Sequence, residues 1–243
     1  MLAALTLRAW TRYLVPLTAI SALAFAAISV AYGLARTFAQ LAVLDVFADP
    51  APNAAFDAPA IHAQLRALWL VGGSAWIVQL ALAGAAMPAV RSLVQGAPIS
   101  QRRAALAGAL GIVRAIVPCA IALLAIVVGG AALVAPGVAL FGLLALTGAA
   151  AEAGLPPPAP LLDSVRVARA RKLAVVAAIA LMFALDFGAA YAIAAHAARD
   201  VPAKPTLDAL LHVHAAARML MLALAVLSPI PACAFAAIYA AKK

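Results

Sequence analysis

The chain has 243 residues, of which 68% are hydrophobic and 10% charged, and its net charge is +9. A soluble domain is closer to half apolar and a quarter charged, and it could not bury this much apolar surface in one core. The composition therefore excludes an ordinary soluble domain and predicts an integral membrane protein. Its basic residues stand in short runs beside hydrophobic segments. This favours a bilayer with anionic headgroups as the partner over nucleic acid, the other partner that a positive net charge suggests.

A spanning helix needs about 20 mostly apolar residues, and the first such segment covers residues 14–35. It is longer than the apolar region of a signal peptide, so we expect an uncleaved anchor, with cleavage after Ala35 as the alternative. Residues 36–66 are polar and predict a loop, and the second span covers residues 68–90. The segment 91–104 then predicts a turn leading into an interfacial helix.

Residues 105–151 form one apolar run that is long enough for two crossings. The turn signal Pro136-Gly137 divides this run into a third span, 112–134, and a short fourth span, 137–151, for which a re-entrant segment is the alternative. A polar stretch with a basic helix follows. The fifth span covers residues 173–195, and the sixth covers residues 210–239 with a kink at Pro229 and Pro231.

These spans predict an all-α polytopic membrane helix bundle, a single domain of about six transmembrane helices arranged as three hairpins. An amphipathic or basic cytoplasmic segment precedes each hairpin, at residues 7–13, 99–111 and 161–172. The positive-inside rule places both termini in the cytoplasm, because most basic residues then lie inside. The richness in alanine and arginine favours a bacterial genome, so we expect the bacterial cytoplasmic (inner) membrane.

Few polar residues fall within the spans, and an ionisable group there is by default a functional hypothesis. Asp186 is the deepest, and Arg218 lies near the outer end of span six. The two spans are consecutive and antiparallel, which predicts a structural pair between Asp186 and Arg218; a proton or ion relay is the alternative. Gln79 and Ser74 of span two and Ser228 of span six are expected to form hydrogen bonds between helices.

Basic residues near the cytoplasmic surface are the candidates for contact with lipid headgroups: Arg102, Arg103, Arg114, Arg166, Arg169, Arg171 and Lys172. For Arg114 the alternative is an ordinary basic flank of span three. All four histidines fall on the predicted outer side, where a zinc or copper site is the alternative to scattered interfacial histidines. We expect no metal site and no cofactor.

One group of motifs resembles a known family. Pro136-Gly137 opens a short span, Glu152-Ala153-Gly154 follows, and a proline-led basic helix then covers residues 160–172. This pattern is similar to the six-helix membrane domain attached to some bacterial glycerophosphodiester phosphodiesterases, a domain that also forms small inner-membrane proteins by itself. The resemblance covers about residues 95–195, and it departs from the family pattern at the proline run 156–158 and in lacking a Gly-x-Trp after the basic helix. No phosphodiesterase catalytic domain fits in the chain, so the activity is not implied.

The sequence contains no His-Glu-x-x-His, no phosphate-binding glycine loop and no Gly-x-Ser-x-Gly. We therefore expect a non-enzymatic protein, either an accessory or scaffold subunit that contacts other membrane-protein subunits or a lipid-interacting bundle. The alternative is a small permease or permease subunit, because transporter sites favour broken helices near the bilayer midplane. Asp186 and the break at Pro229 and Pro231 support that alternative.

Overall fold

The computed structural model describes residues 1–47, 58–156, 158–197 and 207–241, and it describes side chains for residues 1–31, 33, 73–156, 158–196 and 215–241. The chain forms ten helical segments in these ranges and no strand. Six stretches are long and apolar enough to cross a membrane: Leu14–Ala31, Gly73–Val94, Gln101–Ala132, Val134–Ala151, Lys172–His196 and Ala215–Ala240. The predicted all-α polytopic bundle of about six spans is therefore confirmed.

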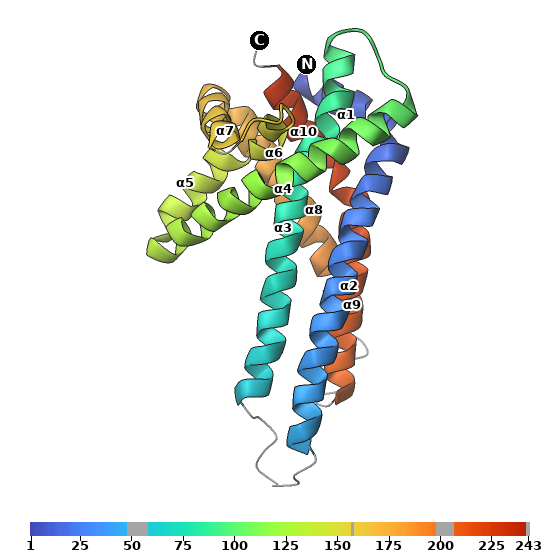
Figure 1. The fold of residues 1–243 in the computed structure, drawn as a ribbon, viewed down its shortest axis with the longest axis vertical. Coiled ribbons are helices and arrows are strands. Elements are labelled where there is room, and N and C mark those ends of the chain that lie inside the picture. The colour runs from blue at the N-terminus through green and yellow to red at the C-terminus, as the bar shows by residue number, and fades with distance from the viewer. Residues whose placement is uncertain (48–57, 157, 198–206, 242–243) are drawn as a thin grey trace.

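Three antiparallel hairpins make up the bundle, as predicted. Helix α2 (Leu14–Phe47) packs on α3 (Ala58–Val94), α4 (Gln101–Ala132) packs on α5 (Val134–Leu144), and α8 (Lys172–Ala197) packs on α9 (Leu207–Leu227). Helices α2, α3 and α9 run along the long axis of the molecule, whereas α4 crosses α3 obliquely and α5 lies beside the far part of α4 (Figure 1). Helix α3 is central, since it contacts α1, α2, α4, α6 and α10.

Four shorter helices gather at one end of the bundle: α1 (Leu2–Arg12), α6 (Thr147–Ala151), α7 (Ala159–Ala170) and the last turns of α10 (Pro229–Ala240) (Figure 1). We call this end, together with the start of α4 and of α8, the basic end. Helix α1 is amphipathic: Ala9 is buried while Arg8 and Arg12 are exposed. After it, the buried Tyr13 donates a hydrogen bond to the Ile99 carbonyl at 3.1 Å and fixes α1 to the α3–α4 connection.

Several predicted boundaries are wrong. The predicted loop at 36–66 is helical over residues 36–47 and 58–66, because helix-forming residues continue past Arg36 and no proline interrupts them before Pro50. The interfacial helix predicted at 99–111 is the first part of α4. Ser100 caps this helix by accepting from the Arg103 amide, and no break separates its first turns from the span.

The hairpin between spans three and four turns at Leu133, which is extended, and not at Pro136-Gly137. Pro136 instead occupies the first turn of α5, where a missing amide hydrogen costs nothing. The fourth span is also divided, because α5 ends at Leu144 and α6 begins at Thr147. The predicted kink in span six is confirmed as a break at Ser228, between α9 and α10.

Glycines let α3, α4 and α6 approach one another at backbone distance. A β-carbon added at Gly111 would lie 2.3 Å from the Gly84 carbonyl oxygen, and one added at Gly148 would lie 1.9 Å from the Leu80 carbonyl oxygen. Helices in lipid gain little from hydrophobic association with one another, so close packing through small residues holds them together. This contact sets the oblique crossing of α4 over α3.

Candidate functional site

An intramembrane polar cluster joins α3, α8 and the break between α9 and α10. The Gln79 side-chain nitrogen (Nε2) donates to Asp186 Oδ1 at 2.8 Å and to Ser228 Oγ at 3.4 Å. Gln79 and Ser228 are buried and Asp186 is half-buried. At 1.5 Å per residue, Asp186 and Ser228 lie about 20 Å along their helices from the basic end, which places them inside a hydrocarbon core about 30 Å thick. The predicted interhelical hydrogen bonds of Gln79 and Ser228 are confirmed.

The predicted pair between Asp186 and Arg218 is wrong. The Asp186 carboxylate accepts from Gln79, while the Arg218 side chain is exposed. Asp186 lies level with Ser228, and Arg218 precedes Ser228 by ten residues on α9, or about 15 Å along the helix axis. The two spans are antiparallel, as predicted, but Asp186 and Arg218 lie at different depths along the bundle and do not meet.

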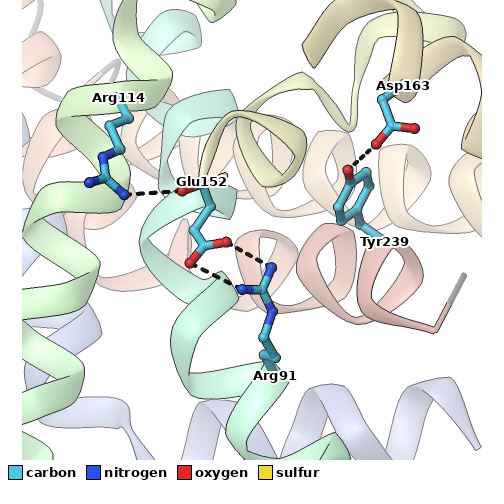
Figure 2. Close-up of polar contacts among 5 residues, drawn as sticks. All are labelled: Arg91, Arg114, Glu152, Asp163 and Tyr239. Carbon is cyan, nitrogen blue, oxygen red and sulfur yellow. Dashed lines mark hydrogen bonds and ion pairs between the residues drawn. The ribbon is translucent and has the colours of Figure 1, made fainter. Parts of the chain in front are cut away.

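A second polar cluster lies at the basic end, and Figure 2 shows it. Arg91 of α3 forms an ion pair with Glu152, which follows α6, at 2.8 Å between Nη2 and Oε2; its other terminal nitrogen donates to Oε1 at 3.4 Å. Arg114 of α4 donates to the Glu152 carbonyl oxygen at 3.3 Å. Glu152 therefore connects α3, α4 and the end of α6. Arg114 stays at this end although it lies well inside α4, because α4 runs obliquely (Figure 1).

Sequence reasoning did not select Glu152 as a site residue. The available signal was its position as an isolated carboxylate directly after a long apolar run, next to an expected turn. Such a carboxylate at a membrane boundary is placed to meet a basic residue of a neighbouring helix end. The sequence offered several arginines at that boundary, and only the packing of α6 against α3 selects Arg91.

The basic helix α7 is fixed to the bundle by its polar side chains. Tyr239 of α10 donates to Asp163 (Figure 2), and Ser164 donates to the Leu143 carbonyl at 2.8 Å. Asp163 also forms an ion pair with Arg166, at 3.6 Å between Oδ1 and Nη1. Arg171 is half-buried and donates to the Ala241 carbonyl, so its guanidinium is engaged within the protein. Arg166, Arg169 and Lys172 are exposed.

A cleft of about 480 Å³ opens between the end of α3 and the start of α4. Its polar lining comprises Arg91, Ser92, Gln95, Arg103 and Glu152, and its apolar lining includes Pro88, Ile99, Leu106 and Leu110. Of the two neighbouring arginines that start α4, Arg103 lines the cleft, whereas Arg102 is exposed outside it. The cleft thus places two guanidinium groups and one carboxylate beside an apolar wall.

Metal binding has no cluster to support it among the residues that the structure describes, where no three His, Cys, Asp or Glu side chains come together. The side chains of His62, His212 and His214 lie outside the described residues. Cys119 and Cys233 are buried and unbonded to each other.

The fold and these sites define a polytopic α-helical membrane protein with its interfacial helices at one end. Comparisons of the chain with protein-family models, with curated proteins and with solved structures found no match. The resemblance of residues 95–195 to the membrane domain of glycerophosphodiester phosphodiesterases therefore stays a prediction.

Proposed function

We propose that the protein is a non-enzymatic, lipid-interacting bundle of the bacterial cytoplasmic membrane, which serves as an accessory or scaffold subunit and holds anionic phospholipid at its basic end. The observation that carries this proposal is the cleft between α3 and α4. Arg91 and Arg103 line it with Glu152 as the single carboxylate, which leaves a net positive charge. Guanidinium groups bind phosphate through paired hydrogen bonds.

The shape of the cleft suits a lipid better than a free anion. Its lining continues from the arginines onto Leu106 and Leu110, which are 61% and 58% exposed on the outer face of α4. A phospholipid that places its phosphate at Arg103 would lay the start of its acyl chains on these leucines. A small soluble anion would gain nothing from that apolar wall.

The charges around the cleft support the same partner. Exposed basic side chains surround the basic end: Arg8, Arg12, Arg102, Arg103, Arg166, Arg169 and Lys172. The acidic residues there are engaged, since Glu152 pairs with Arg91 and Asp163 contacts Arg166 and Tyr239. Each basic residue near an anionic leaflet contributes about 1 kcal/mol of attraction, so this end favours the cytoplasmic side.

A matched pair of substitutions tests the cleft. Arg103→Gln and Arg102→Gln remove the same charge from neighbouring positions, but only Arg103 lines the cleft. A lipid that binds only the folded protein raises its melting temperature, and the rise grows with the logarithm of the ratio of lipid concentration to Kd. We expect an anionic phospholipid added to detergent micelles to stabilise the wild type more than a zwitterionic one does, and Arg103→Gln to lose more of this difference than Arg102→Gln. Equal stabilisation by both lipids, or equal losses in both variants, would overturn the proposal.

The proposed orientation has its own test. Single cysteines are placed at Asn53, Gln101, Pro157 and Lys204 in a Cys119→Ala, Cys233→Ala background and are probed with a membrane-impermeant thiol reagent. We expect positions 53 and 204 to react in intact cells, and positions 101 and 157 to react only after lysis. Labelling of position 101 or 157 from outside would contradict a cytoplasmic basic end.

A small permease is the second candidate function, favoured by the polar cluster at the α9–α10 break. Broken helices beside polar groups near the midplane are typical of transporter sites, and Gln79, Asp186 and Ser228 form such a group. If the protein is a permease, ion or solute flux into proteoliposomes should be lost in Asp186→Asn. Flux that is absent in the wild type, or that Asp186→Asn leaves unchanged, would argue against transport.

A further inference from the structure

A second hollow, separate from the cleft between α3 and α4, lies on the membrane-facing side of the bundle between α5 and α8. It has a volume of about 440 Å³, and α3 and α4 complete its lining. Three aromatic rings form one wall: Trp76 lies 5.5 Å from Phe141 and 5.6 Å from Phe183, and these two phenylalanines lie 5.6 Å apart, measured between ring centroids. We call this hollow the aromatic groove.

Glycines keep the aromatic groove open. Gly130, Gly137 and Gly142 line it, and a β-carbon added at Gly142 would have no heavy atom within 4 Å. The aliphatic side chains at its mouth are exposed, with Val138 at 68% and Val176 at 61%. Because these residues belong to spanning segments, the groove opens onto the hydrocarbon of the bilayer.

The groove is apolar along its lining, and two basic residues lie beyond the end of it that is nearer the basic end of the bundle. Val176, Ile179 and Phe183 of α8 line it at helical spacing, and Lys172 precedes Val176 by one turn on the same face. Lys172 is exposed, as is Arg169 in the last turn of α7, a helix that contacts both α5 and α8. Phe183 lies about 16 Å along α8 from Lys172, close to half the thickness of a hydrocarbon core of about 30 Å. The groove therefore runs from the level of lipid headgroups towards the middle of the membrane.

We propose that the aromatic groove binds an acyl chain of an anionic phospholipid, whose phosphate lies between Lys172 and Arg169. We infer an anionic headgroup because these two side chains are cations, and we infer an acyl chain because the lining of the groove is wholly apolar. The choice of headgroup rests on the proposed function, because it requires the basic end to face an anionic leaflet.

Trp76 reports directly on the occupant, since bromine atoms quench tryptophan fluorescence on contact. In a Trp10→Phe, Trp69→Phe background, Trp76 is the remaining one of the three tryptophans. The full chain is reconstituted into phosphatidylcholine vesicles that contain a small fraction of phospholipid brominated in the middle of its acyl chains, with either a phosphatidylglycerol or a phosphatidylcholine headgroup. We expect the anionic lipid to quench Trp76 at about tenfold lower mole fraction. The double variant Lys172→Gln, Arg169→Gln should lose this preference.

A variant that fills the groove, together with a matched control, tests whether the lipid lies in it. Gly142→Leu places a side chain in the groove, whereas Gly188→Leu places the same side chain at an exposed glycine of α8 that also has no heavy atom within 4 Å. Quenching of Trp76 should fall in Gly142→Leu and stay at the starting level in Gly188→Leu. At both positions the added β-carbon has no heavy atom within 4 Å, and the melting temperature of each variant checks that it is folded.

Three results would overturn this inference, and they separate it from the proposed function. Quenching that persists in Gly142→Leu would place the lipid outside the groove. Trp76 protected from both brominated lipids would mean that protein fills the groove. Quenching that Gly142→Leu abolishes, but that is equal for both headgroups, would leave an acyl-chain site without anionic selection. The proposed function fails separately, when anionic lipid gives no stabilisation that depends on Arg103.

Discussion

The contact between α3 and α6 makes a measurable prediction at Gly148. An alanine there would put its β-carbon 1.9 Å from the Leu80 carbonyl oxygen, 2.8 Å from the Leu80 carbonyl carbon and 3.2 Å from the Ala81 Cα. All three are backbone atoms, so no side-chain rotation relieves the overlap, and α6 must move away from α3. Overpacking of this kind costs about 1–3 kcal/mol, and each kcal/mol lowers the melting temperature of a chain of this size by about 2–4 °C.

Two further glycines extend the test into a series. A β-carbon at Gly111 would lie 2.3 Å from the Gly84 carbonyl oxygen, and one at Gly84 would lie 2.8 Å from the carbonyl oxygens of Gly111 and Gly148. We therefore expect the melting temperature in detergent to fall most in Gly148→Ala, less in Gly111→Ala and least in Gly84→Ala.

Gly188→Ala is the matched control for this series, because its β-carbon would have no heavy atom within 4 Å. An alanine in an exposed helical position is more favourable than a glycine by up to about 1 kcal/mol, so the control should melt at or slightly above the wild type. Thermal unfolding of the purified protein, followed by loss of the monodisperse peak in size-exclusion chromatography, measures these shifts. If Gly148→Ala melts within about 2 °C of Gly188→Ala, a shift of at most about 1 kcal/mol, the α3 and α6 backbones do not meet at Gly148 as described.

The two polar clusters give further predictions from double-mutant cycles on thermal stability in detergent. Asp186→Ala and Gln79→Ala should show a coupling energy of about 0.5–1.5 kcal/mol, because the two side chains are in contact and polar pairs inside membranes couple weakly. The effects of Asp186→Ala and Arg218→Ala on stability should be additive within about 0.5 kcal/mol. A coupling energy between Asp186 and Arg218 clearly above that limit would show that the two side chains are in contact, which would contradict the structure. Arg91→Ala and Glu152→Ala should couple by about 0.2–1 kcal/mol in low salt, because the ion pair is partly exposed. The coupling energy should be smaller in high salt, which screens the two charges. A coupling energy that does not change with salt would contradict a direct ion pair.

The sequence alone determined the class of the fold and the approximate place of each span. Length and hydropathy were sufficient because a bilayer imposes one thickness on every crossing helix. The break in span six was also visible, since Pro229 cannot continue the hydrogen bonds of the preceding turn. Gln79 and Ser228 were recognised as interhelical donors because a polar side chain in hydrocarbon needs a partner.

The helix ends predicted from the sequence were wrong at several positions outside the apolar spans. The charges and turn formers within residues 36–66 suggest a loop, yet the first twelve of these residues are mostly apolar helix formers and extend α2 to Phe47. At the α4–α5 hairpin the strongest turn signal, Pro136-Gly137, lies inside α5, because proline fits the first turn of a helix as well as it fits a turn.

Only the tertiary structure decided which side chains meet. The partner of Asp186 depends on the relative depth of α3, α8 and α9, and the partner of Glu152 depends on how α6 lies against α3. The second arrangement follows from the backbone contacts of Gly84, Gly111 and Gly148, which hold α4 and α6 against α3. In a chain so rich in alanine and glycine, small residues occur at helical spacing on many faces, so the sequence does not mark the face that packs. The cleft between α3 and α4 and the aromatic groove both arise from the oblique course of α4 and α5, and a hydropathy pattern records the length of a helix but not its direction.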